Sequence, residues 1–380
     1  MNNMMEPKIR FKGFEGGWKT STIGEIAPLQ RGYDLPTNNV ISGTIPVVYS
    51  NGILRFHNEG KCQAPAIITG RSGTIGKFTY IDHGEYWPHN TSLWVTTFHK
   101  NYPRFVYYFF QNVGFEKYAT GSGVPTLNRN DIHKHIESIP SNKEEQQAIA
   151  SYFTTLDSQI SASTSRLASL KQMKAASLQA MFPQEGETVP KIRFKGFEGE
   201  WKKVKLGKLF SERIENNVDG EMLSVTMNNG IIKAAENGRF DNSNSDKSKY
   251  KVVKVGDIAY NSMRMWQGAS GCSQYEGIVS PAYTVVVPNA NIHSLFFAYL
   301  FKTIPMINLF RLHSQGLTKD TWNLKYPAFS IIEVSYPESK AEQQAIASYF
   351  TSLDRQISLQ SQRLEKLKQI KSACLDKMFV

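Results

Sequence analysis

The stretch GTIGK at residues 73–77 combines glycines with a lysine, the residue types that hold a phosphate through backbone amides and an ammonium group. The full phosphate-binding pattern also requires a glycine at position 71 and a serine or threonine at position 78. This chain has Arg71 and Phe78 there. We therefore do not predict a nucleotide-binding loop in this stretch.

Other catalytic patterns are missing as well. The chain has no G-x-G-x-x-G, no N-P-P-aromatic motif of adenine methylation and no H-E-x-x-H. Its eight histidines are scattered, and we predict His133 and His135 to be polar surface residues rather than metal ligands. The acidic residues form no nuclease-like cluster beside a lysine. The sequence thus predicts a chain without catalytic residues and without a metal site of its own.

Polar residues on glycine-bounded loops are the remaining candidates for binding. Arg, Lys, Asn and Gln donate the hydrogen bonds that read base edges and hold phosphates, and glycines let backbone amides approach a phosphate. The predicted DNA contacts of the first half are Arg71, Ser72, Lys77, His89, Asn90 and Thr126. Those of the second half are Arg264, Gln267, Ser280 and Lys319. A single polar loop is usually solvated surface, but corresponding loops in both halves favour a nucleic-acid interface.

The composition agrees with such a partner. The net charge of +11, from 44 basic against 33 acidic residues, favours a polyanion, although many ordinary proteins are basic. At 380 residues the chain exceeds the usual size of one hydrophobic core, so we expect two domains. No apolar run is long enough to cross a membrane, and the start lacks the apolar stretch of a secretion signal. Three distant cysteines without C-x-x-C spacing indicate a reducing, cytoplasmic setting.

Two blocks of sequence occur twice and must position these loops. Residues 7–18 read PKIRFKGFEGGW and residues 190–201 read PKIRFKGFEGEW. The second block is EQQAIASYFTTLDSQIS at 145–161 and EQQAIASYFTSLDRQIS at 342–358. The sequences between the blocks hardly resemble one another. Duplicated blocks that flank dissimilar regions indicate a chain that holds two different domains in one fixed mutual geometry.

Each second block begins a long amphipathic helix, because its apolar residues recur in alternating steps of four and three. The first seam is Ile149, Phe153, Leu156, Ile160, Ser163, Leu167 and Leu170, and the second is Ile346, Phe350, Leu353, Ile357, Gln360, Leu364 and Leu367. The polar Ser163 and Gln360 either set the register or face solvent. We predict capping boxes, SNKE at 141–144 and SKAE at 339–342, at the two helix starts.

Neither helix can bury its seam alone. Short connections favour antiparallel pairing of the two helices as a coiled coil. The alternative is that each helix packs only on its own globular domain. The regions between the blocks predict α+β domains, with β-rich runs at 66–81 and 280–288 and core helices at 105–113 and 295–304. The stretch 183–191, rich in Pro, Gly and Glu, predicts the hinge between the halves.

Five further motifs lie between the duplicated blocks: RSGTIG at 71–76, GxxxPTL at 121–127, MRMWQGASG at 263–271, GIVSPAY at 277–283 and GLTKD at 316–320. Together with the blocks, they make nearly the whole chain resemble the DNA-specificity subunit of type I restriction-modification systems. No single motif is specific, but the combination is.

The resemblance implies an α+β fold in which two target-recognition domains of mixed α/β character are separated by an antiparallel two-helix spacer, with a pseudo-twofold internal repeat. The implied segments are target-recognition domain 1 at 1–140, a spacer helix at 141–183, target-recognition domain 2 at 184–337 and a spacer helix at 338–380. Each domain would read one half of a bipartite, asymmetric target in double-stranded DNA. The helices would set the gap between the two half-sites.

The resemblance also implies partners. Two methyltransferase subunits would dock on the repeats, and motor-nuclease subunits would join that core. The chain itself would be non-catalytic, with S-adenosylmethionine, ATP and magnesium bound in the partner subunits. Two other functions stay open: the detached specificity half of a single-chain restriction-methylation enzyme, and a stand-alone DNA-binding regulator with two recognition heads. The regulator predicts a helix-turn-helix in each variable region, whereas the residues there favour β-rich loops.

Overall fold

The computed structural model of the protein describes residues 6–121, 123–227, 229–237, 246–319 and 321–380. Ser122 and Asp320, which belong to two of the internal motifs, lie outside the described residues. The chain divides into two compact units. Unit 1 comprises Met1–Thr164 and Gln362–Val380, and unit 2 comprises Ser165–Ser361. Each unit therefore contains one head and part of each long helix.

Two four-stranded sheets form most of the head of unit 1. The first has the strand order β2(Leu29–Arg31)-β9(Ser92–Val95)-β6(Ala66–Gly70)-β7(Phe78–Ile81), all antiparallel. The second has the order β4(Gly52–His57)-β3(Ile45–Tyr49)-β8(Glu85–Pro88)-β5(Cys62–Gln63), with β3 and β8 parallel. Two antiparallel pairs complete the unit: β1(Lys19–Thr22) with β12(Ile136–Ile139), and β10(Ala119–Thr120) with β11(Thr126–Leu127).

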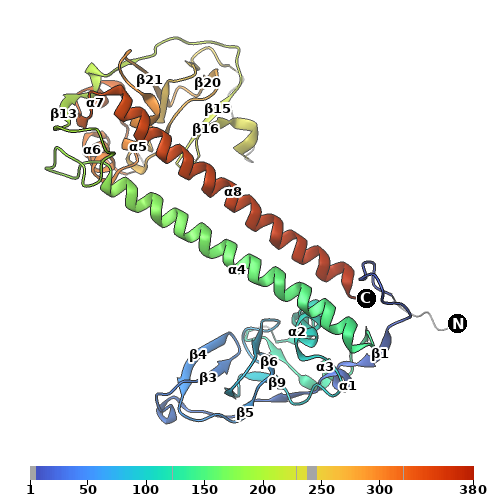
Figure 1. Cartoon of the computed structure of the whole chain (residues 1–380). Helices are drawn as coiled ribbons and strands as arrows, with labels where there is room; N and C mark the ends of the chain where they lie inside the picture. Colours follow the sequence, from blue (N-terminus) through green and yellow to red (C-terminus); the bar gives the residue numbers. More distant parts are fainter. Residues whose placement is uncertain (1–5, 122, 228, 238–245, 320) are drawn as a thin grey trace. The chain divides into compact units, whose positions relative to one another are not determined.

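Helix α2 (Pro103–Val113) joins the head of unit 1 to the first long helix, α4 (Lys143–Ala180), and lies beside its N-terminal part in Figure 1. Phe105 and Phe109 of α2 are buried in one core with Ile149 and Phe153 of α4. The remaining helices of this unit are short: α1(Ile23–Ile26), η1(Thr37–Asn39), η2(Phe115–Tyr118) and α3(Arg129–His133).

The head of unit 2 repeats the first of these sheets. Its order is β14(Phe210–Glu212)-β21(Tyr283–Pro288)-β18(Ile258–Asn261)-β19(Ser270–Cys272). Three antiparallel pairs surround it: β13(Lys202–Lys205) with β22(Glu333–Tyr336), β15(Leu223–Thr226) with β16(Gly230–Lys233), and β17(Lys251–Val253) with β20(Gly277–Val279). The α+β class predicted from the sequence is confirmed.

The helices of unit 2 differ from the prediction at one point. The predicted core helix at 295–304 is two helices, α5 (Ser294–Leu300) and α6 (Ile304–His313). The break is at Thr303, which caps the start of α6 with extended backbone, and Pro305 then stands in the first turn. Proline cannot continue a preceding helix but suits the first turn of a new one. The other helices are η3(Leu206–Lys208), η4(Ala234–Asn237), η5(Met265–Gln267), α7(Tyr326–Ser330) and α8(Lys340–Met378).

The starts of α4 and α8 correct the predicted capping boxes. In α4 the cap is Asn142, whose side-chain oxygen accepts from the amide of Glu144 at 2.8 Å, rather than Ser141. In α8 the hydroxyl of Ser339 does accept from the amide of Glu342 at 3.3 Å. The carboxylate of Glu342 does not return to the cap, because it binds an arginine and a tryptophan, as described below. Asn142 and Ser339 are equivalent positions of the repeat.

The apolar seams of α4 and α8 are covered along their length. Buried seam residues are Ile149, Phe153, Leu156, Leu170, Ile346, Phe350, Leu353 and Leu364, and partly buried ones are Ile160, Leu167, Ile357 and Leu367. Ser163 and Gln360 are buried too, at 4% and 9% exposure, so they do not face solvent. The seams near the helix starts pack into the heads as well as against the other helix. Each helix therefore packs both against the other helix, along its apolar seam, and on its own head.

Within unit 1 the two helices run antiparallel. The hydroxyl of Tyr152 on α4 lies 3.4 Å from Sγ of Cys374 on α8. Five residues later, Asp157 lies 2.6 Å from the ammonium of Lys371. Partner numbers fall on α8 as they rise on α4, which is the predicted direction.

Unit 2 contains the same pairs with the helices exchanged. Ser177 on α4 lies 2.9 Å from the hydroxyl of Tyr349 on α8, and the ammonium of Lys174 lies 2.5 Å from Asp354. Tyr349 and Asp354 are the repeat equivalents of the tyrosine and aspartate that α4 supplies in unit 1. Each unit is therefore built from the first part of one long helix and the last part of the other.

A buried carboxylate in each unit fastens the first duplicated block to the second. In unit 1, Nε and Nη2 of Arg10 donate to the two oxygens of Glu145 at 2.7 and 2.9 Å, and the indole of Trp18 donates to the same carboxylate at 3.4 Å. In unit 2 the corresponding distances from Arg193 and Trp201 to Glu342 are 2.7, 2.8 and 3.3 Å. We name each set of three residues a carboxylate clamp.

The clamp carboxylates are almost fully buried. Glu145 and Glu342 are 2% and 1% exposed, and their arginines 16% and 14%. Hydrogen bonding to the carboxylate raises the pKa of Arg10 and of Arg193. A buried, bidentate pair has good geometry, and removal of one partner leaves an uncompensated charge.

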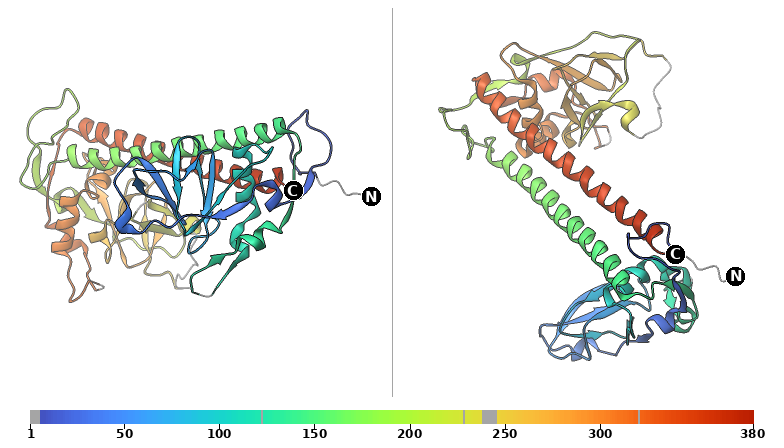
Figure 2. Two further views of the ribbon diagram at one scale, coloured as in Figure 1. Left: turned by 90° about the horizontal axis from the view of Figure 1, so that it is seen from below. Right: turned by 45° about the vertical axis from the view of Figure 1, so that its right-hand side comes forward.

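The first described residues meet the end of α8 within unit 1. The amide of Ile9 donates to the carbonyl of Lys377 at 2.9 Å, and both views of Figure 2 show the end of α8 beside the first described residues. The same hydrogen bond in unit 2 joins Ile192 to Ala180 at 2.9 Å, where residues 183–189 provide the covalent connection. The stretch 183–189 therefore has no covalent counterpart in unit 1.

Among the described residues, no single helix is long and apolar enough to span a membrane. The bent pair α5 and α6 reaches the required length and composition only when the two helices are combined. Phe296, Phe297 and Phe310 of this pair are buried in the core of unit 2.

Replacing Glu342 by Ala is expected to lower the free energy of unfolding of unit 2 by about 3 kcal/mol, because Arg193 keeps its charge in a partly buried place without a carboxylate partner. Urea unfolding, followed by hydrogen exchange of residues 190–201, measures the effect. Glu338→Ala, which removes an exposed ion pair with Lys202, is the matched control and should change stability far less. Equal losses in the two variants would contradict the role given to the clamp.

A chain in which Val380 is joined directly to Met1 and which is reopened within 183–189 is expected to fold. Val380 with residues 1–6 has the same length as 183–189, so the new connection reproduces the existing one. Circular dichroism and the thermal unfolding midpoint compare the permutant with the parent chain. A chain reopened within the buried strand 66–70 is the control and should not fold. Loss of structure in the first permutant would argue against the equivalence of the two connections.

Candidate nucleic-acid interface

Three loops of the unit 1 head meet through backbone hydrogen bonds. The amide of Arg71 donates to the carbonyl of Thr91, and the amide of Leu127 donates to the carbonyl of Arg71, both at 2.8 Å. The amide of Gly73 donates to the carbonyl of Pro125 at 2.9 Å. The loop cluster of unit 1 is residues 71–73, 89–91 and 125–127. The turn at 73–77 connects the antiparallel strands β6 and β7, so no helix follows it as in a nucleotide-binding loop.

Five of the six predicted contacts of this half lie in the loop cluster: Arg71, Ser72, His89, Asn90 and Thr126. Their side chains are partly engaged within the unit. Nε of Arg71 donates to the carbonyl of Asn90 at 3.2 Å, and the amide group of Asn90 donates to the carboxylate of Asp34. Lys77 lies outside the cluster, since its ammonium donates to the carbonyl of Asn51 at 2.8 Å.

His89 is the one histidine of the loop cluster. Its Nδ1 lies 2.9 Å from the hydroxyl of Thr91, and its ring packs against Tyr49 with 4.2 Å between the centroids. Burial lowers the pKa of His89, although the carboxylate of Asp34 acts in the opposite direction. A neutral imidazole at physiological pH can accept or donate a hydrogen bond but supplies no charge to a phosphate.

The other histidines considered from the sequence are structural. Nε2 of His133 accepts from the amide of Leu29 at 2.8 Å, where α3 packs on β2. His135 lies between the hydroxyl of Tyr118 at 2.7 Å and the carboxylate of Glu137 at 2.8 Å. His133 and His135, predicted to be polar surface residues rather than metal ligands, are half-buried and hydrogen-bonded within unit 1. In the part of the chain that the structure describes, no group of three or more His, Cys, Asp or Glu side chains is placed to hold a metal ion.

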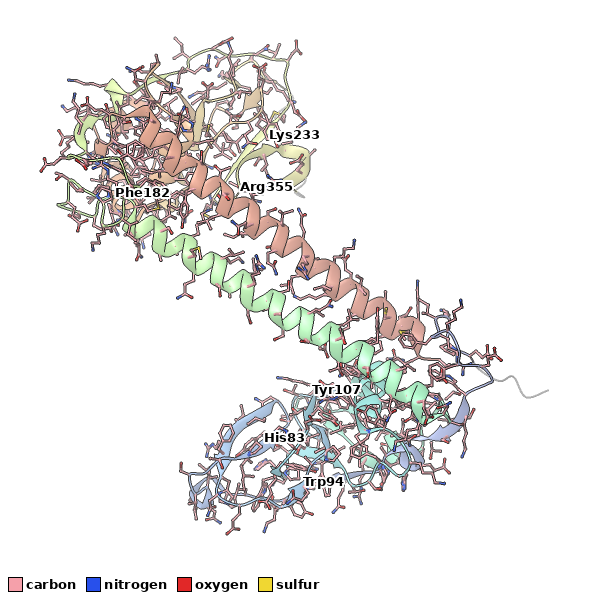
Figure 3. All side chains as sticks on the ribbon, in the orientation of Figure 1. His83, Trp94, Tyr107, Phe182, Lys233 and Arg355 are labelled. Carbon is pink, nitrogen blue, oxygen red and sulfur yellow. The ribbon has the colours of Figure 1, made fainter. Side chains whose placement is uncertain are left out.

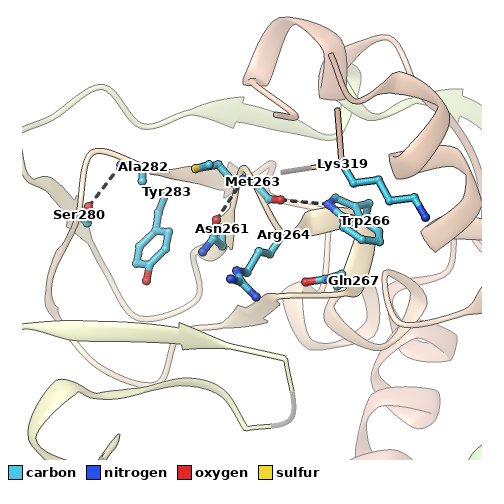
Figure 4. Close-up of a pocket in the computed structure, with 9 residues that line it drawn as sticks. All are labelled: Asn261, Met263, Arg264, Trp266, Gln267, Ser280, Ala282, Tyr283 and Lys319. Carbon is cyan, nitrogen blue, oxygen red and sulfur yellow. Dashed lines mark hydrogen bonds between the residues drawn. The ribbon is translucent and has the colours of Figure 1, made fainter. Parts of the chain in front are cut away.

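The head of unit 2 has an open pocket of about 310 Å³ at the ends of β18 and β21. Its lining residues, shown in Figure 4, are Asn261, Met263, Arg264, Trp266, Gln267, Ser280, Ala282, Tyr283 and Lys319. All four predicted contacts of this half, Arg264, Gln267, Ser280 and Lys319, are in this set. We name it the unit 2 pocket.

A tight turn presents Arg264 and Gln267 to the pocket. β18 ends at Asn261, whose side-chain oxygen accepts from the amide of Met263 at 3.0 Å, and the amide of Gln267 donates to the carbonyl of Arg264 at 3.0 Å. Met265 between them is fully buried. One buried side chain inside the turn thus orients its neighbours outward, and Figure 4 shows the side chains of Arg264 and Gln267 on the same side of the turn.

Two aromatic rings border the exposed donors. The indole of Trp266 donates to the carbonyl of Met263 at 3.0 Å and packs edge-on against Trp322, with 5.3 Å between the ring centroids. Tyr283 lines the opposite part of the pocket in Figure 4. Among the described residues, no carboxylate pairs with Arg264 or Lys319. Unpaired cations beside aromatic faces and amide groups are suited to bind phosphates and base edges.

The sequence did not single out the aromatic members of the pocket. Trp266 and Tyr283 lie within or at the end of internal motifs, next to residues that were predicted to contact DNA. Lys302 beneath the turn was also missed, although a lysine in the apolar run 295–304 is a signal that could have found it. What sequence alone lacks is the loop packing that brings the 264–267 turn and residue 319 to one pocket.

A family model for the type I restriction modification DNA specificity domain matches the chain twice, over residues 15–172 and 198–369. The two matches coincide with the two halves of the internal repeat. They cover more than half of the chain. No curated protein matches the chain by sequence.

Two solved structures resemble the fold over almost the whole length. The crystal structure of a type I restriction-modification system S subunit from M. genitalium is 15% identical, with a TM-score of 0.66 and 99% of each chain covered. A structure from work on complex assembly and conformational transition of the type I R-M system is 14% identical, with a TM-score of 0.51, and covers 96% of this chain and 98% of that one. At this identity the likeness concerns the fold.

Proposed function

Because the chain belongs to the family of type I restriction-modification DNA specificity domains, we propose that its two heads read the two halves of a bipartite, asymmetric DNA target. Like other subunits of its family, the chain is a specificity subunit without catalytic activity of its own. The heads are the segments 1–140 and 184–337, and the segments 141–183 and 338–380 are the spacer, a division that stays a prediction.

One observation carries the proposal at the level of residues. Arg264, Gln267, Ser280 and Lys319 come from three loops that are distant in sequence, yet they line one pocket. Arginine can make two hydrogen bonds to a guanine edge and glutamine two to an adenine edge, whereas lysine suits a phosphate. We assign base reading to Arg264 and Gln267 and a phosphate contact to Lys319. In unit 1 the loop cluster is the corresponding reading surface.

We further propose that the repeated frame docks two methyltransferase subunits equivalently, and that motor-nuclease subunits join that core. A chain with two copies of one surface suits two copies of one partner. S-adenosylmethionine, ATP and magnesium then belong to those partners. Methylation of an adenine requires the base to leave the stack, so this chain has to hold the opened DNA in register while a partner reacts.

Replacing Arg264 by Ala is expected to weaken binding to the specific target by about 1–3 kcal/mol, the value of a bidentate base contact, and to leave binding to unrelated DNA almost unchanged. Titration of labelled duplexes at fixed salt measures both affinities. Arg355→Ala, on the exposed face of α8 in Figure 3, is the control and should change neither. Equal weakening on specific and unrelated DNA would reassign Arg264 to a phosphate, and no weakening would remove it from the interface.

Deleting this chain from its host is expected to abolish methylation at one bipartite adenine motif, which mapping of methylated adenines across the genome detects. Deleting the matched heptads 162–168 and 359–365 should then shorten the unread stretch of that motif, because seven residues of helix span about 10 Å, or about three base pairs. Both half-sites should stay unchanged. The paired substitution Ser158→Ala with Arg355→Ala, at equivalent exposed positions, is the control.

An unread stretch of unchanged length in the shortened chain would show that α4 and α8 do not set the spacing. Unchanged methylation after deletion of the chain would contradict the proposed function itself. The two results are separable, since the second needs no altered helix.

A further inference from the structure

Lys302 lies in the break between α5 and α6, and its side chain reaches Gly268 at the end of the turn that carries Arg264 and Gln267. Its ammonium donates to three backbone carbonyls: that of Gly268, that of Ser270 at 2.9 Å and that of Met227 at 3.1 Å. An ammonium group has three N–H donors, so these carbonyls use all of them. No carboxylate among the described residues forms an ion pair with Lys302. A partly buried lysine with only carbonyl partners is uncommon and calls for an explanation.

The three carbonyls belong to segments that build the pocket. Gly268 ends the turn that carries Arg264 and Gln267, and it has left-handed backbone with φ of +81°. Ser270 begins β19, and Met227 follows β15 in the neighbouring hairpin. The stem of Lys302 also lies against Gly268, where an added Cβ would be 3.6 Å from its Cδ. One side chain therefore ties the turn to two other segments of the head.

We infer that Lys302 is a positioning residue for base reading, which holds the 264–268 turn so that Arg264 and Gln267 face the DNA. The inference rests on the proposed function, because it assigns a role toward the same pocket. Lys302 itself does not line the pocket. Its action passes through the carbonyls of the turn.

Unit 1 has no such lysine, which provides an internal comparison. Tyr108 on α2 and Tyr299 on α5 occupy equivalent places, since their hydroxyls donate to Asp157 and Asp354 at 2.9 and 2.8 Å. Three residues beyond these tyrosines, unit 1 has Gln111 where unit 2 has Lys302. A neutral amide cannot change charge with pH. Only the unit 2 head should therefore depend on the protonation of this position.

The surroundings of Lys302 make its charge sensitive to pH near neutrality. Burial, and in addition the positive charge of Lys174 on α4, lower the pKa of Lys302 to about 8. Lys174 is itself paired with Asp354 on α8. Burial raises the pKa of Tyr299 on α5 and raises the pKa of Cys272 on β19 to about 11, so both stay neutral below pH 9.

Deprotonation has opposite effects on stability and on the turn. A lysine whose pKa is lower in the folded chain contributes more stability as pH rises from about 8 toward its ordinary value of 10.5. The neutral amine has only two N–H donors, so one of the three carbonyls loses its partner. Rising pH should thus loosen the turn without unfolding the head. A purely structural role for Lys302 does not give this combination.

The test measures discrimination by the full chain, with its methyltransferase partners where binding requires them, at pH 7 and pH 9. The probes are duplexes that carry the methylated motif found by mapping, or that motif with one half-site altered. We expect the wild type to lose roughly tenfold in discrimination at the unit 2 half-site at pH 9, and nothing at the unit 1 half-site. In Lys302→Met, discrimination at the unit 2 half-site should already be low at pH 7 and should not depend on pH. Lys302→Arg, which keeps its charge, should show no loss at pH 9.

A second measurement needs no DNA. Fluorescence of Trp266 in the turn, obtained as the difference between the chain and its Trp266→Phe variant, should change between pH 7 and pH 9 and should not change in Lys302→Arg. This measurement remains valid even if Arg264→Ala shows that the pocket does not bind DNA. Failure of the proposed function can therefore be distinguished from failure of the role inferred for Lys302. Discrimination and fluorescence that are both independent of pH in the wild type would overturn the inference. A pH-dependent loss that persists in Lys302→Arg would overturn it as well.

Discussion

The buried carboxylate at the start of each long helix is the interaction on which the rest of the fold depends. Glu145 and Glu342 each bind an arginine and a tryptophan from the first duplicated block, so a short loop segment, a helix start and the first strand of a head are fixed together. A charge at this depth is tolerated only because both oxygens have donors. The same requirement explains why Glu342 does not complete a capping box. Its carboxylate is already engaged.

Contacts of the duplicated blocks (the frame) are repeated in both units, whereas the loops of the two heads differ. Frame contacts occur in pairs: Gln146 and Gln343, both buried, each accept from the amide that precedes a head helix and each donate to a proline carbonyl before a long helix. The loops proposed to contact DNA follow equivalent strands of the two heads but carry different residue types. Unit 1 closes its loops with backbone hydrogen bonds and a neutral histidine. In unit 2, no carboxylate of the described residues pairs with the arginine and the lysine that line the pocket. A frame with repeated contacts can thus carry heads of unlike surface.

Predictions from the sequence were reliable where a local residue pattern is enough to determine the tertiary packing. The spacing of apolar residues predicted both long helices, because burial of a continuous stripe leaves few alternatives. The short connections between the segments predicted their antiparallel pairing. Predictions were less reliable where contacts between residues distant in sequence determine the local structure. Asn142 rather than its neighbouring serine caps α4, and Pro305 breaks a run that is apolar enough to be one helix. The predicted donors Arg264 and Lys319 were identified by residue type, but their meeting in one pocket depends on loop packing that no local pattern encodes. The same holds for the anchoring of the turn by Lys302.

The near identity of residues 7–18 and 190–201 has a consequence for inheritance. Gene segments that encode matching blocks are sites where homologous recombination can exchange the coding sequence between them. An incoming head would meet the same arginine, tryptophan and buried carboxylate that its own frame offers. A single crossover within these blocks can therefore replace one head, while the carboxylate clamps of the frame are inherited intact.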